Sequence, residues 1–162
     1  MKASMATLLA GFSLSQGASE TAHFIDWESG DARRQLNSSL SLGLGRTGVY
    51  EQLWDVAEEC GTAGWDGTSA RPIGTDTYRN AYRFLESLPL GTSAPSIGAE
   101  PDGHITLEWY SHPHRTLSVS VSPEGELHYA ALLGASKQFG TEPFFGESPR
   151  VILDLIQRVG RA

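Results

Sequence analysis

The sequence contains a single cysteine, Cys60, among its 162 residues. One cysteine cannot form a disulfide within the chain, and it cannot supply the thiolates of a structural zinc site. Long apolar runs are missing too, since no stretch reaches the roughly 20 residues of a membrane-spanning helix. We therefore expect a protein of the reducing cytoplasm that does not enter a membrane.

Basic residues are also scarce. The chain has 12 Lys and Arg against 19 Asp and Glu, which gives a formal net charge of −7 at pH 7. Direct binding of nucleic acid is not expected, because it requires clustered cations that displace counterions from the phosphates. An acidic surface is instead suited to a protein partner that presents a basic one.

The first 46 residues are rich in Ser, Gly, Ala and Leu and show little helical periodicity. Their apolar patch, from Met5 to Leu14, is interrupted by glycine and serine and preceded by one lysine, so it matches a signal peptide poorly. Segments 23–27 and 39–44 could form strands. We interpret residues 1–46 as a poorly defined segment, partly disordered or adding strands, and residues 47–162 as one domain.

Three later segments place apolar residues at helical spacing. We expect helices over about 49–60, 77–88 and 149–159. Asp76 is positioned to cap the second helix and Pro89 to stop it, while Ser148 is positioned to cap the third.

Between the second and third helices the apolar residues alternate instead, which predicts strands over 104–110, 115–121 and 126–132. Cross-strand partners must point to the same face, so we pair Trp109 with Leu117 and Val119 with Tyr129. Gly125 then takes the left-handed position of the turn between the last two strands. The predicted fold is α+β: an antiparallel β-meander of three or more strands with about three helices packed on one face.

Motifs for catalysis and cofactor binding are weak. The sequence GLGRTG at 43–48 matches a dinucleotide-binding pattern, but a half-exposed strand precedes it and no strand follows the next helix. The chain has no G-x-S-x-G, S-x-x-K or H-E-x-x-H motif. Cys60 falls on the apolar side of a helix, where a free cysteine usually packs as a small hydrophobe. We therefore predict no catalytic residue and no cofactor.

Histidines near a turn keep a second interpretation open. His112 and His114 flank a proline and lie close to Glu108 in the sequence, so they are weak candidates for metal ligands. His104 and His128 fall on the outward face of the predicted sheet, apart from each other. A small hydrolase or metal-dependent enzyme would use Asp66, Glu108 and the turn histidines.

The segment GWDGTSARPI, residues 64–73, joins the first two helices. Trp65 is large enough to anchor a loop, the Asp66 carboxylate can accept backbone N–H bonds, and Gly67 tolerates positive φ. We interpret these three residues as a structural turn, because no second polar group can be placed beside Asp66.

Two surfaces are candidates for binding a partner. One is the acidic side of the first helix, formed by Glu51, Asp55, Glu58 and Glu59. These like charges disfavour the helix, so they indicate a basic partner, pairing with Arg79 and Arg83, or a solvated face. The other is the outward face of the sheet, where Thr106, Glu108, Ser118 and Ser120 form a flat polar patch.

Several segments together resemble a group of small bacterial proteins with no established activity and a GWDG-x-x-A-x-P motif. They are GWDGTSARPI, FLESLP, PDGHITLEW and LSVSVSPEGELHYAALLG, within residues 49–159. The resemblance implies a bacterial or phage origin, where small acidic proteins often serve as inhibitors, antitoxins or immunity-type binders. We therefore predict a non-enzymatic protein-binding module. The alternatives are the small hydrolase or metal-dependent enzyme that would use Asp66, and a subunit of a larger assembly joined through residues 1–46.

Overall fold

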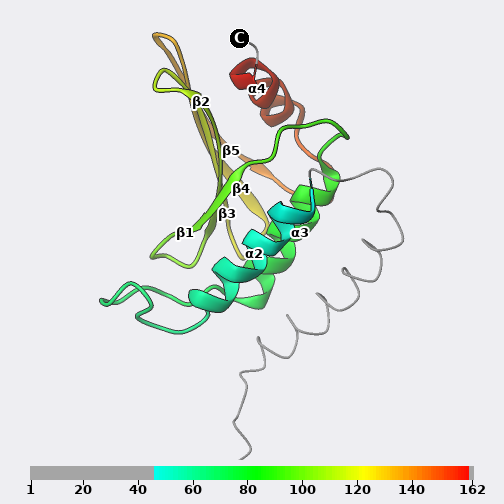
Figure 1. Ribbon diagram of the computed structural model, residues 1–162. Helices are drawn as coiled ribbons and strands as arrows, with labels where there is room; N and C mark the ends of the chain where they lie inside the picture. The colour runs from blue at the N-terminus through cyan, green and yellow to red at the C-terminus, as the bar shows by residue number, and fades with distance from the viewer. Residues whose placement is uncertain (1–45, 161–162) are drawn as a thin grey trace, which may run out of the picture.

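A computed structural model describes residues 46–160 and confirms the α+β class (Figure 1). The elements are α2 (Thr47–Glu59), α3 (Thr75–Ser87), β1 (Ser96–Ala99), β2 (Ile105–His112), β3 (Arg115–Val121), β4 (Glu126–Leu133), β5 (Ser136–Pro143) and α4 (Arg150–Gly160). The candidate strands at 23–27 and 39–44, and nearly all of the segment 1–46, lie outside the described residues. Within 46–160, no helix has the length and apolar character needed to cross a membrane.

The five strands form one antiparallel meander in the order β1-β2-β3-β4-β5. The predicted register is confirmed, since Trp109 pairs with Leu117 and Val119 with Tyr129. Gly125 has φ +83°, as the turn between β3 and β4 requires. The strands β1 and β5 were not predicted from the sequence.

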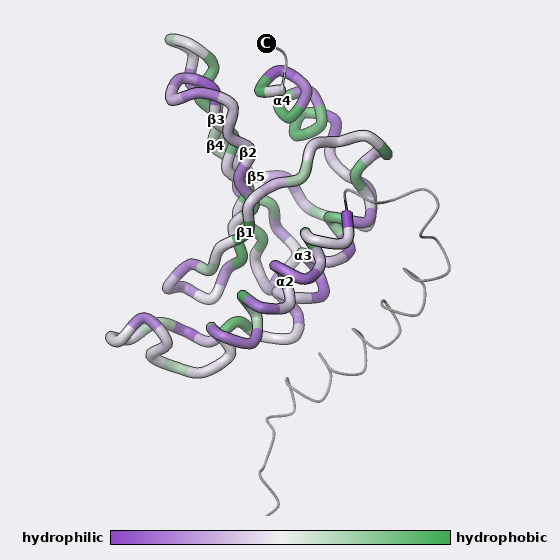
Figure 2. The backbone as a smooth tube through the Cα atoms, in the orientation of Figure 1, coloured by the Kyte–Doolittle hydropathy of each residue, from purple (hydrophilic) through white to green (hydrophobic). Residues whose placement is uncertain are grey.

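Helices α2, α3 and α4 cover the same face of the sheet (Figure 1). Helix α4 packs on β2, β3 and β4, α3 packs on β2 and β3, and α2 packs on β1 and α3. Figure 2 shows hydrophobic and hydrophilic residues alternating along the helices, as expected where each buries one side. The strands contribute to the core Ile97, Ile105, Leu107, Trp109, Leu117, Val119, Val121, Leu127 and Ala131, all buried.

The start of the second helix differs from its prediction. Helix α3 begins at Thr75, and its N-cap is Gly74, which makes no side-chain capping bond. Asp76 therefore lies inside the first turn, where its carboxylate forms an ion pair with Arg79 at 2.8 Å. A carboxylate in the first turn still interacts favourably with the helix dipole, so the residue suits the helix start without capping it.

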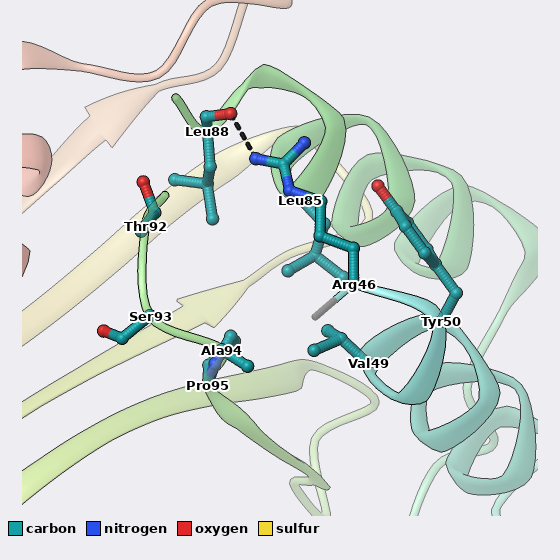
Figure 3. Close-up of a pocket in the computed structure, with 9 residues that line it drawn as sticks. All are labelled: Arg46, Val49, Tyr50, Leu85, Leu88, Thr92, Ser93, Ala94 and Pro95. Atoms are coloured by element: carbon teal, nitrogen blue, oxygen red, sulfur yellow. Dashed lines mark hydrogen bonds between the residues drawn. The ribbon is translucent and has the colours of Figure 1, made fainter. Parts of the chain in front are cut away.

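Arg46, the first described residue, binds the C-terminal end of α3. The Arg46 guanidinium donates a hydrogen bond to the carbonyl of Leu88, the C-cap residue of α3 (Figure 3). It also donates to the carbonyl of Pro89 at 3.2 Å. Cations beside the last carbonyls of a helix satisfy unpaired acceptors and complement the dipole. Arg46 thus fixes the start of α2 against the end of α3.

Candidate functional site

The face of the sheet opposite the helices is covered by no other element of residues 46–160 (Figure 1). We call it the outer face. Register and burial assign to it Ser96, Gly98, Glu100, Thr106, Glu108, Tyr110, Thr116, Ser118, Ser120, Glu126, His128, Ala130, Leu132, Lys137, Phe139 and Thr141. It includes all four strand residues predicted as a polar patch, so the sequence located this surface correctly.

One end of the outer face carries a histidine pair. The rings of His104 and His128 are stacked, with centroids 5.7 Å apart and planes 10° from parallel. The prediction that these two residues lie apart is therefore wrong. A single strand, β3, lies between β2 and β4, and the two rings meet across it.

Hydroxyls and carboxylates surround the two imidazoles. The Nδ1 atom of His104 lies 3.2 Å from the Ser120 hydroxyl, and Nδ1 of His128 lies 2.9 Å from the Thr141 hydroxyl. Asp102 approaches His104 at 3.6 Å, and Glu126 approaches His128 at 3.8 Å. This end of the face is therefore a connected polar cluster that spans β2 to β5.

The cluster contains a serine, a histidine and an aspartate, but not the geometry of a catalytic triad. A triad uses the two imidazole nitrogens separately, one for the serine and one for the aspartate. Here Ser120 and Asp102 both approach Nδ1 of His104. The three residues cannot pass a proton through the ring in this arrangement.

Toward its other end, the outer face carries exposed aromatic side chains among polar ones. Tyr110 is 62% exposed and Phe139 is 82% exposed, although both are large hydrophobic side chains. Phe139 is the cross-strand partner of Ala130, and Leu132 is the next outward residue on β4. Phe139 was not predicted as a surface residue of the sheet, because its segment, SKQFGTEP, lacks the apolar alternation that predicts a strand.

The predicted acidic surface belongs to the helical layer instead. Glu51, Asp55, Glu58 and Glu59 are all exposed on α2, as expected. Within residues 46–160 they form no ion pair, and Arg79 pairs with Asp76 of its own helix. The two predicted partner surfaces thus lie in different layers of the molecule.

The loop between α2 and α3 is held by the residues singled out in its sequence. The Trp65 indole donates to the Arg71 carbonyl at 2.9 Å, and Gly67 has φ +80°. The Asp66 carboxylate accepts hydrogen bonds from the Thr68 hydroxyl at 2.6 Å and from the Thr68 and Ala70 backbone N–H groups. These bonds, led by the one from the Thr68 hydroxyl, lower the pKa of the Asp66 carboxyl.

The residues of the enzyme hypothesis are not brought together. His112 and His114 lie at the β2–β3 turn, at the end of the sheet remote from the loop that holds Asp66 (Figure 1). Their rings are 5.8 Å apart, and Nδ1 of His112 accepts the His114 backbone N–H at 3.3 Å. Among the described residues, the three side chains that lie close enough together to share a metal ion are a different set: Glu100, Asp102 and His104.

Two hollows in the described part of the chain offer little to a catalytic mechanism. The first, beside Arg46 and Pro95, has a volume of about 20 Å³, enough for one water molecule (Figure 3). The second, about 320 Å³, lies between α4 and the α3–β1 loop. Its lining includes Leu90, Leu153 and Gln157 but no titratable side chain.

Cys60 is buried at the end of α2. Burial, together with the negative charge of Glu59, raises the pKa of its thiol. Since the thiolate is the nucleophile, this environment makes the cysteine less reactive.

Comparison of the chain with protein-family models, with curated proteins and with solved structures found no match.

Proposed function

We propose that the protein is a non-enzymatic protein-binding module whose partner docks on the outer face of the sheet. The observation that carries this proposal is the exposure of Tyr110 and Phe139 on a face that no described element covers. Aromatic side chains gain much free energy when they are buried, and they are over-represented among the residues that dominate binding.

The size of the outer face suits a stable interface. Four strands of seven or eight residues, together with the four-residue β1, lie about 4.8 Å apart and span roughly 20 Å by 23 Å at most. Side-chain relief increases that area toward the roughly 800 Å² that each partner buries in a standard complex. The short hydroxyl side chains of Thr106, Ser118 and Ser120 add little height to the outer face, so that a partner can approach its backbone closely.

The charge of the outer face selects the kind of partner. One lysine, Lys137, and four carboxylates lie on or beside it. The carboxylates are those of Glu100, Asp102, Glu108 and Glu126. A second copy of the same face would meet like charge, whereas a basic surface would be attracted. Such complementarity accelerates encounter and fixes orientation, while the aromatic contacts supply most of the affinity.

A basic, nucleic-acid-handling protein is the natural target, and the resemblance to small bacterial proteins suggests an inhibitor, antitoxin or immunity-type role. The protein would then act by occupying the partner's surface. This mechanism requires no catalytic group of its own, which agrees with the separation of Asp66 from the turn histidines.

The test is affinity capture from the native host with matched baits. Wild-type protein should retain a partner that Phe139→Ser and Tyr110→Ser lose, and raising the salt concentration should slow its association. Phe145→Ser is the control, because Phe145 is 89% exposed but lies in the β5–α4 loop. Equal recovery of the partner by all four baits would contradict docking on the outer face. The assembly-subunit alternative would then be tested by comparing the sizes in solution of the full-length and 47–162 chains.

A further inference from the structure

We propose that Glu100, Asp102 and His104 bind one divalent transition-metal ion at the β1–β2 turn. Their potential ligand atoms all lie within 4.8 Å of one another. Atoms that share a Zn²⁺ ion at 2.0–2.2 Å are separated by about 3.3–3.6 Å. Small side-chain rotations are therefore enough to bring the three groups onto one ion.

The backbone that carries these groups is closely held. The Glu100 N–H donates to the His104 carbonyl, and the Gly103 N–H donates to the Glu100 carbonyl, both at 2.9 Å. The buried Thr77 hydroxyl reaches the Gly103 carbonyl at 3.1 Å, and Gly103 itself has φ +89°. A turn fixed in this way does not have to be ordered when the ion binds, which lowers the entropic cost of binding.

One of the three groups also has an outer partner. The Thr106 hydroxyl donates to Oε1 of Glu100. Hydrogen bonds of this kind orient metal ligands and typically change metal affinity by about 10- to 100-fold.

The imidazoles distinguish this cluster from an ordinary acidic turn. His104 supplies a nitrogen ligand, and His128, on β4, is stacked against it. Nitrogen ligands favour zinc, nickel and copper, whereas sites for calcium and magnesium consist of oxygen atoms. Three protein ligands would leave a position for water, as in open zinc sites.

The experiment is calorimetric titration of the full-length, metal-free protein with Zn²⁺ and, separately, with Mg²⁺. We expect one Zn²⁺ per chain, an increase in Tm, and much weaker binding of Mg²⁺. Asp102→Asn and His104→Gln should each weaken Zn²⁺ binding at least tenfold. The double variant His112→Gln, His114→Gln is the matched control and should bind as the wild type does.

Circular dichroism and the Tm of each metal-free variant would show that the fold is retained. Zn²⁺ bound elsewhere on the chain would survive His104→Gln, and this result would overturn the proposal. So would the absence of stoichiometric Zn²⁺, or equal binding of Mg²⁺ and Zn²⁺. None of these results depends on Tyr110 or Phe139, so the metal site and the docking surface can fail independently.

Discussion

Tyr129 of β4 lies directly against Gly140 of β5, its partner in the sheet register. A Cβ atom placed on Gly140 would approach the Tyr129 hydroxyl oxygen to 2.7 Å and its Cζ to 2.9 Å. The aromatic ring thus covers a glycine that has no side chain of its own, which is a recognised way to stabilise glycine at a sheet edge.

This contact predicts opposite effects for two glycine substitutions. Gly140→Ala should lower the free energy of unfolding by about 1 kcal/mol, because the ring has to move. Gly98→Ala, on β1, should be neutral or raise it by up to about 1 kcal/mol, since no atom lies within 4 Å of its added Cβ. Urea denaturation of both variants measures the difference. In a Tyr129→Leu background, Gly140→Ala should no longer lower the free energy of unfolding. If the loss persists, the Tyr129 ring is not its cause.

The same pair shows why part of the sheet escaped prediction. Strands β2, β3 and β4 bury one face under helices, so their apolar residues alternate and their register follows from the sequence. Strand β5 lies at the edge, is mostly exposed on both faces, and contributes Gly140 where a larger residue would not fit. Strand β1 has four residues, too few for a period-two pattern to be detected.

The candidate site, like the sheet, was predicted from the sequence only in part. Faces follow from alternation, so the polar patch around Ser118 and Ser120 could be located from the sequence. Stacking of His104 on His128 could not, because it depends on how side chains lean across β3. The exposure of Phe139 could not be predicted without the strand that carries it.

The exposed aromatics of the outer face should contribute little to stability. Phe139→Ser and Tyr110→Ser should change the free energy of unfolding by less than about 0.5 kcal/mol, because neither side chain is buried in the isolated protein. Leu117→Ala, on the opposite face of the sheet, should cost about 2–5 kcal/mol. Denaturant titration tests the contrast. A large loss at Phe139 would mean that it packs within the molecule and is not available to a partner.

Asp66 should contribute to stability in a pH-dependent way. Its carboxyl has a pKa below the ordinary value of 3.8, led by the hydrogen bond from the Thr68 hydroxyl, so the folded state favours the ionised form. The contribution is present above pH 3.8 and is lost as the pH falls through the lower, folded-state pKa. Asp66→Asn should therefore weaken the pH dependence of Tm below about pH 4, relative to the wild type. An unchanged profile would exclude this role. The control is Glu124→Gln, at an exposed carboxylate of the β3–β4 turn for which the described residues provide no ion pair.

Cys60 should react slowly with thiol reagents in the folded protein. Burial raises the pKa of its thiol, which reduces the fraction of reactive thiolate at pH 8, and the surrounding core limits access. Alkylation by iodoacetamide should be at least tenfold slower than in the urea-unfolded chain. Equal rates would show that the end of α2 opens readily. Mass spectrometry of both samples gives the two rates.

The acidic side of α2 can be separated from the outer face by changing one residue. Asp55 lies four residues from both Glu51 and Glu59, so Asp55→Lys replaces two repulsive i,i+4 pairs with two attractive ones. We expect the free energy of unfolding to rise by about 0.5–1 kcal/mol at low salt, and the gain to shrink as salt screens the charges. Glu108→Lys, on the outer face, is the matched control for charge, with an expected stability change under about 0.5 kcal/mol. If the outer face is the docking surface, Glu108→Lys should slow association with a basic partner more than Asp55→Lys does. If Asp55→Lys slows association more than Glu108→Lys does, the partner binds on α2. The four carboxylates of α2, which disfavour their own helix, would then be explained by the partner that they bind.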